Sequence, residues 1–68
     1  MNKEIKIQGM SCEHCRKHVE EVLLKMDNTT GSVDLDNNKA IITTTADDAA
    51  ITIAIEEAGY KVVGIKNV

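Results

Sequence analysis

The 68-residue sequence contains no phenylalanine, tryptophan or proline, and its only tyrosine is Tyr60. Without aromatic side chains on which successive bases could stack, it offers no platform for single-stranded nucleic acid. Eight Lys and Arg residues against eleven Asp and Glu residues give a net charge of −3. That charge repels a phosphate backbone rather than collecting one. We therefore expect no nucleic acid partner.

The sequence also lacks a long apolar run. No stretch approaches the ~20 apolar residues that a membrane span needs. The first dozen residues alternate polar and apolar side chains, unlike the continuous apolar region of a secretory signal. We therefore expect a cytoplasmic protein without membrane insertion. A chain of this length buries only about 60% of its unfolded surface. A deep substrate cavity would use up the core, so we expect one domain over residues 1–68 and no enzymatic activity.

Six segments show the periodicity of regular secondary structure. In chain order, the pattern predicts a strand over 3–8, a helix over about 13–26, strands over 32–35 and 39–45, a helix from 47 or 48 to 58, and a strand over 61–65. Residues 27–31 and 36–38 have the composition of turns. This order predicts an α+β, ferredoxin-like βαββαβ sandwich, in which two helices cover one face of a four-stranded antiparallel sheet.

Within these elements, the pattern assigns orientations to several side chains. Ile5 and Ile7 should point inward from the first strand, and Asp47 or Asp48 should cap the second helix. The pattern does not decide which residue of the pair 62–63 points inward. Lysines that flank the strands are expected to protect sheet edges from pairing with other chains; they are Lys3, Lys6, Lys61 and Lys66.

The chemically distinctive segment is GMSCEHC, residues 9–15, where the first strand ends and the first helix begins. Cys12 should lie on the loop and Cys15 in the first helical turn, a spacing that can bring the two sulfurs together. Free N–H groups and the helix dipole favour thiolates there, and Arg16 and Lys17 add positive charge nearby. Two thiolates without hard oxygen ligands suit Cu(I), with Zn(II) behind it.

Other classes of protein also use a CxxC pair. A structural zinc site needs four ligands, and the only histidines are His14, which should point outward, and His18, which could be recruited only at a cost in geometry. A thioredoxin-like oxidoreductase needs a larger framework. Two cysteines that merely pack as small apolar side chains are disfavoured by the polar Glu-His between them. These three alternatives rank below a two-thiolate site but stay open.

Residues 9–15 resemble the GMxCxxC signature of heavy-metal-associated (HMA) domains, in the MSCxHC form of bacterial copper chaperones of the CopZ type. Residues 54–60, AIEEAGY, resemble the closing motif of the same family. The similarity runs along the whole chain. The departure is at residues 27–31, where this sequence is shorter than the family pattern, so the start and register of the second strand stay open.

The resemblance implies roles for individual residues. Cys12 and Cys15 match the metal ligands of the family. Met10 is similar to a methionine that packs under the loop, and Tyr60 to a residue that approaches the loop from the second helix. Ser11 is at a position where relatives specific for divalent ions often carry aspartate, and the absence of that carboxylate favours a soft monovalent ion. The residues expected to support the metal loop are Met10, Ser11, His14 and Tyr60.

The function implied by the resemblance is that of a cytosolic copper chaperone. It would bind one Cu(I) and deliver it, by ligand exchange, to the metal-binding domain of a copper-transporting P-type ATPase. Zn(II), Ag(I) and Hg(II) are further ions for binding in vitro, and a copper-bridged homodimer is a further assembly. Two alternatives remain at this point: an N-terminal metal-binding domain of a heavy-metal P-type ATPase, and a mercury-binding relative.

Overall fold

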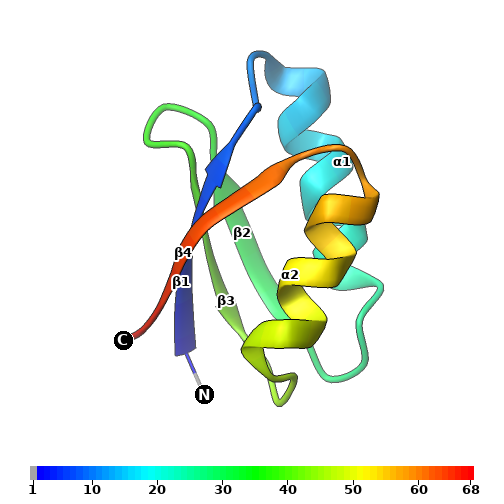
Figure 1. Cartoon of the computed structure of the whole chain (residues 1–68), viewed down its shortest axis with the longest axis vertical. Helices are drawn as coiled ribbons and strands as arrows, with labels where there is room; N and C mark the ends of the chain where they lie inside the picture. The colour runs from blue at the N-terminus through cyan, green and yellow to red at the C-terminus, as the bar shows by residue number, and fades with distance from the viewer. Residues whose placement is uncertain (1) are drawn as a thin grey trace.

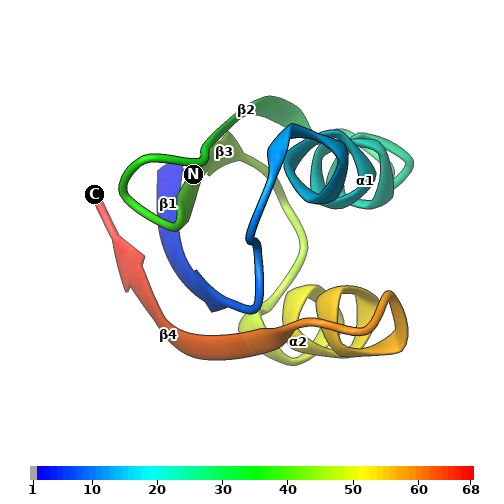
Figure 2. The same cartoon turned by 90° about the horizontal axis from the view of Figure 1, so that it is seen from above.

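Six elements build a four-stranded antiparallel sheet with two helices on one of its faces (Figure 1). The computed structural model describes residues 2–68. Its elements are β1 (Asn2–Gln8), α1 (Glu13–Leu24), β2 (Thr30–Asp34), β3 (Lys39–Thr43), α2 (Asp48–Glu57) and β4 (Lys61–Asn67). The strand order is β2-β3-β1-β4, and Figure 2 shows α1 and α2 side by side on the same side of the strands. The predicted ferredoxin-like fold is confirmed.

The core lies between the inner face of the sheet and the two helices. Ile5 and Ile7 of the central strand β1 are buried, as their alternation predicted. Each helix contributes a buried pair one turn apart, which is the stripe expected of a helix lying on a sheet. The buried apolar residues are Ile5, Ile7, Met10, Val19, Leu23, Val33, Ala40, Ile42, Ile51 and Ile55.

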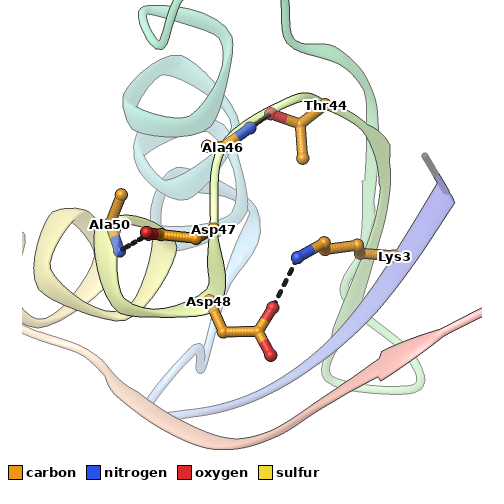
Figure 3. A network of polar contacts seen from close by, with 6 residues as sticks. All are labelled: Lys3, Thr44, Ala46, Asp47, Asp48 and Ala50. Carbon is orange, nitrogen blue, oxygen red and sulfur yellow. Dashed lines mark hydrogen bonds and ion pairs between the residues drawn. The ribbon is translucent and has the colours of Figure 1, made fainter.

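The start of α2 is fixed by two adjacent aspartates (Figure 3). The Asp47 carboxylate accepts a hydrogen bond of 2.9 Å from the Ala50 N–H, so Asp47 is the N-cap. Asp48 forms an ion pair of 2.5 Å with the ammonium group of Lys3. The expectation that Lys3 and Lys6 protect a sheet edge is wrong, because both lie on the central strand β1. Lys3 in addition is buried on the same face as Ile5.

Strand β2 begins at Thr30, although residues 27–31 have the composition of a turn. Gly31 pairs with Ile42 across the hairpin and has a φ of +147°. A β-carbon on Gly31 would lie 2.3 Å from the carbonyl oxygen of Ile41. This glycine therefore serves the close approach of two strands, and the turn ends two residues earlier than the sequence predicted.

Strand β4 is an edge strand, and it contains a bulge. Lys6 pairs with Gly64, and the next residue of β1, Ile7, pairs with Val62. Val63 is therefore an extra residue in β4 without a partner in β1. Val62 is half-buried against the core, whereas Val63 is 59% exposed. The bulge decides the orientation that alternation alone left open.

The two ends of the described chain lie together. The Val68 N–H donates a 3.0 Å hydrogen bond to the Asn2 carbonyl oxygen, and Figure 1 shows both ends at the pole opposite the loop between β1 and α1.

Neither helix of residues 2–68 is long and apolar enough to cross a membrane.

Candidate metal centre

The structure brings the two cysteine sulfurs together at the start of α1. Cys12 is the N-cap residue, with an extended backbone and no capping hydrogen bond from its side chain, and Cys15 lies in the first turn. The Cys12 thiol donates to the Cys15 sulfur at a Sγ–Sγ distance of 3.7 Å. Cys12 is exposed, Cys15 is half-buried, and neither forms a disulfide. The pair is thus reachable from solvent on the Cys12 side.

The surroundings of Cys15 stabilise its thiolate. A hydrogen bond from the Ser11 backbone, followed by hydrogen bonds from the Tyr60 hydroxyl and the Cys12 thiol, lowers the pKa of Cys15 from 9.0 to about 6. Donors directed at a sulfur favour its charged form, and partial desolvation opposes them only weakly. At neutral pH this cysteine is therefore mainly a thiolate, the form that binds metal.

Tyr60 reaches the cysteines because α2 ends next to their loop. Gly59, with a φ of +99°, follows the last residues of α2 and turns the chain. The Tyr60 ring then packs beside Gly9, at the other end of the loop. The hydrogen bond from the Tyr60 hydroxyl to Cys15 raises the pKa of the tyrosine, because the phenol serves as the donor.

His18 is a contact of this site that the sequence did not predict. Its Nδ1 lies 3.3 Å from the Tyr60 hydroxyl oxygen. The two rings meet edge to face, with centroids 5.7 Å apart and an interplanar angle of 72°. A weak indication was available, because His18 follows Cys15 by three residues and so lies on the same side of α1. The tyrosine partner could not be inferred from local spacing.

The remaining residues assigned to the loop occupy different environments. Met10 belongs to the core and is 6% exposed. The Ser11 hydroxyl oxygen lies 4.0 Å from the Cys15 sulfur. His14 is exposed on α1. The structure thus gathers Ser11 and Tyr60 around Cys15, places Met10 beneath the loop, and leaves His14 facing solvent.

The positive charge expected beside the sulfurs is smaller than the sequence suggested. The Arg16 guanidinium forms ion pairs with Glu13 and, at 2.8 Å, with Glu20. These two carboxylates raise the pKa of Arg16 and offset its charge. Of the two basic residues next to the motif, only Lys17 is without such an ion pair in the described part of the chain. A broad basic patch is therefore not formed by these two residues.

The set of potential metal ligands around the two cysteines is small. Among residues 2–68, no three or more His, Cys, Asp or Glu side chains are grouped so that they could hold a metal ion. A structural zinc site, with its four protein ligands, has no counterpart there. What the structure offers is one pair of thiols, one of them poised as a thiolate.

The rate at which iodoacetamide alkylates Cys15 should depend on pH with a midpoint near pH 6, because the pKa of Cys15 is lowered to about 6. Only the thiolate reacts, so the rate should rise from pH 5 and level off above pH 7. Tyr60→Phe removes one donor and should move the midpoint upward. Peptide mass spectrometry at a series of pH values would locate the label on Cys15. Equal midpoints in the two proteins would show that the Tyr60 hydroxyl does not stabilise the thiolate.

Comparison with known proteins points to one family. The family model of the heavy-metal-associated domain matches residues 4–61. The protein named copper chaperone CopZ from Staphylococcus haemolyticus is 40% identical over 68 residues, covering 91% of this chain and 97% of the chaperone. A copper-exporting P-type ATPase from the same organism is 37% identical over 65 residues, which cover 91% of this chain and 8% of the ATPase.

Solved structures show the same relationship. The structure of a CopZ metallochaperone superposes with a TM-score of 0.86 at 31% identity, covering 93% of this chain and 100% of that one. Oxidized MerP from Ralstonia metallidurans superposes with a TM-score of 0.87 at 21% identity, over 98% of this chain and 97% of its own, which shows a shared fold. Taken with the match over residues 4–61, these similarities place the chain in the heavy-metal-associated domain family.

Proposed function

We propose that this protein is a cytosolic copper chaperone, which carries one Cu(I) between Cys12 and Cys15 and passes it to the metal-binding domain of a copper-transporting P-type ATPase. The observation that carries the proposal is the exposed pair of sulfurs 3.7 Å apart, supported by the lowered pKa of Cys15. Relatives named as copper chaperones, at about 40% identity over most of the chain, add to this support. The metal is cargo, and no bond-making catalysis is proposed.

The sulfur pair can adjust to a soft ion of low coordination number. With metal–sulfur bonds of about 2.3 Å, as for thiolate-bound zinc, a linear arrangement needs sulfurs about 4.6 Å apart. The observed 3.7 Å is short of this distance. Because Cys12 is exposed and its side chain makes no capping hydrogen bond, it can rotate outward to receive the ion. Thiolates select Cu(I) over harder ions, which makes Cu(I) the proposed cargo.

Low coordination also provides the route for transfer. An ion held by two sulfurs, one of them exposed, leaves positions at which a thiolate from a partner can bind. The incoming thiolate then binds before either outgoing sulfur leaves, and the ion is never released to water. Cys12 is the sulfur that should leave first, because Cys15 is held by Tyr60 and Ser11.

The proposed partner follows from the match to the copper-exporting ATPase. A segment of that protein is 37% identical to this chain, so donor and acceptor would bind copper in similar sites. Transfer between similar sites has an equilibrium constant near one, and its direction is then set by removal of copper from the acceptor. The same match supports the alternative that this chain is itself a domain of such an ATPase.

The proposal is tested by a transfer experiment under anaerobic, reducing conditions. The Cu(I)-loaded protein is mixed with the metal-binding domain of a copper-exporting ATPase, the two are separated by ion exchange, and copper is measured in each fraction. We expect copper in both fractions within the mixing time. The acceptor domain with both of its cysteines replaced by serine is the matched control. Copper that stays entirely on the donor would refute the chaperone function.

Besides the complex with the ATPase domain, we propose that two copies of this protein form a copper-bridged homodimer. Two copies can share one ion through their exposed Cys12 sulfurs, since each pair faces solvent. Sedimentation at half an equivalent of Cu(I) per chain should show a dimer that is absent from the metal-free protein. A single monomeric species at every copper ratio would exclude it.

Metal preference is expected to depend on Ser11. Its hydroxyl lies 4.0 Å from the Cys15 sulfur, so a carboxylate at this position would add a hard oxygen ligand of the kind that Zn(II) accepts. Ser11→Asp should narrow the preference for Cu(I) over Zn(II), whereas Ser11→Ala should leave it unchanged. Competition of the two ions, with each bound ion quantified, measures the preference. Tighter Zn(II) than Cu(I) binding by the unaltered protein would contradict the assignment of copper.

A further inference from the structure

A second group of metal-binding side chains lies on α1, next to the cysteines but separate from them. His14 and His18 are four residues apart, both exposed, and they line one surface hollow of ≈ 300 Å³ together with Lys17 and Glu21. Residues four apart on a helix are neighbours on one face. The two imidazoles therefore share one side of the helix and open to the same volume of solvent.

We propose that His14 and His18 form a second metal site, for a divalent cation of the Zn(II) class. Two histidines with this spacing on one helix face bind zinc in metalloproteases, and imidazole nitrogens suit Zn(II), Ni(II) and Cu(II). Glu21 contributes negative charge to the hollow rather than a third ligand, since no group of three potential ligands is formed among residues 2–68. Water completes the coordination of the ion.

The hydrogen bond between His18 and Tyr60 supports this assignment. It occupies Nδ1 of the His18 ring at 3.3 Å, and the edge-to-face contact with Tyr60 fixes the plane of the ring. The free nitrogen, Nε2, is then available to a cation. Histidines that bind metals usually have their other nitrogen held by a hydrogen bond of this kind, which sets the orientation of the ring. His18 is thus oriented before any ion arrives.

Opposing charges determine how tightly such a site can bind. Lys17 lines the same hollow, and His14 lies in the first turn, where the helix dipole disfavours a cation. Glu21 and the net charge of −3 act in the opposite direction. With two protein ligands and solvent on the open side, the ion exchanges readily. The chain would thus sort ions by ligand softness, with divalent ions on imidazole and Cu(I) on thiolate.

The test uses the full chain with Cys12→Ser and Cys15→Ser, so that zinc cannot bind to thiols and the outcome does not depend on the copper proposal. Zn(II) is titrated into this protein by calorimetry, while the ring signals of both histidines are followed by NMR. We expect saturable binding of one ion with shifts of both rings. His14→Gln or His18→Gln should each abolish it, whereas Glu56→Gln on the other helix, as the control, should not change it.

Two further variants sharpen the result. Tyr60→Phe removes the partner of Nδ1 and should weaken Zn(II) binding about tenfold, and Lys17→Gln removes an opposing charge and should strengthen it. Absence of saturable binding, or binding that survives either histidine substitution, would overturn the proposed site. Full affinity in Tyr60→Phe would overturn the role of the hydrogen bond in orienting His18. Circular dichroism confirms that each variant is folded.

Discussion

Replacing either Cys12 or Cys15 by serine should reduce Cu(I) affinity to that of the protein with both residues replaced. Each sulfur supplies half of a two-ligand site. The only other soft donor in the loop is the thioether of Met10, which is buried in the core. A hydroxyl is a poor ligand for a soft ion. Titration of each variant against a chromophoric Cu(I) chelator under anaerobic conditions measures the loss.

The fold should survive both substitutions, because Cys12 is exposed and Cys15 is only half-buried. Far-ultraviolet circular dichroism and the melting temperature provide this control. Ser11→Ala tests for effects of altering the loop itself. It keeps the backbone hydrogen bond from residue 11 to Cys15 and removes only the weaker contact of the hydroxyl, so this variant should compete for copper as well as the unaltered protein does. If either cysteine variant retained near-normal competition, the two-thiolate site would be wrong.

The largest loss of stability near the site is expected from Met10→Ala. Met10 is 6% exposed and belongs to the core directly before the metal loop. Truncating a buried methionine costs about 2–5 kcal/mol, through lost burial and the cavity left behind. Small domains have a total unfolding free energy of about 5–15 kcal/mol, so a large part would be lost. Urea denaturation of the metal-free protein measures the change.

Met10→Leu separates packing from metal binding. Leucine is similar in volume to methionine and should cost less than about 1.5 kcal/mol, with unchanged Cu(I) affinity. A large loss of affinity in Met10→Leu at an unchanged melting temperature would instead make the Met10 thioether a ligand. That outcome would also require the side chain to leave the core in the copper-bound state.

Features that depend on local sequence were predictable. The inward faces of Ile5 and Ile7 follow from strict alternation, and an aspartate cap follows from carboxylates placed just before an apolar stripe. The sequence left the cap open between Asp47 and Asp48, and the structure assigns it to Asp47. The proximity of Cys12 and Cys15 likewise follows from their spacing at a helix start, where one turn brings the side chains to the same side. Each of these needs only neighbours within one or two turns.

Features set by contacts between distant segments were not predictable. Gly31 belongs to a segment with the composition of a turn, but it lies in strand β2. The backbone of Ile41 and Ile42 in strand β3 comes so close to Gly31 that a side chain would not fit there. The inward direction of Val62 depends on a bulge, and a single extra residue reverses the alternation beyond it. In both cases the deciding information is in the partner strand.

The same limit applies around the metal loop. The resemblance to HMA domains suggested that Tyr60 approaches the loop, but its contact with His18 joins residues 42 positions apart in sequence. The pairing of Arg16 with Glu13 and Glu20 is different, because both partners lie one helical turn away and their spacing could have indicated it. The residue types thus indicated the chemistry of the site, and the contact between Tyr60 and His18 required the structure.

The hydrogen bond between Val68 and Asn2 has a consequence for how the domain can be attached to something else. Both ends of the described chain lie at one pole, and the loop between β1 and α1, which contains Cys12, lies at the other (Figure 1). A tether at either end therefore holds the molecule with its cysteine pair facing away from the anchor. In a tandem array of such domains, or in a domain attached to a larger protein, the cysteine pair would stay accessible. The architecture thus places the points of attachment at the pole opposite the proposed copper site.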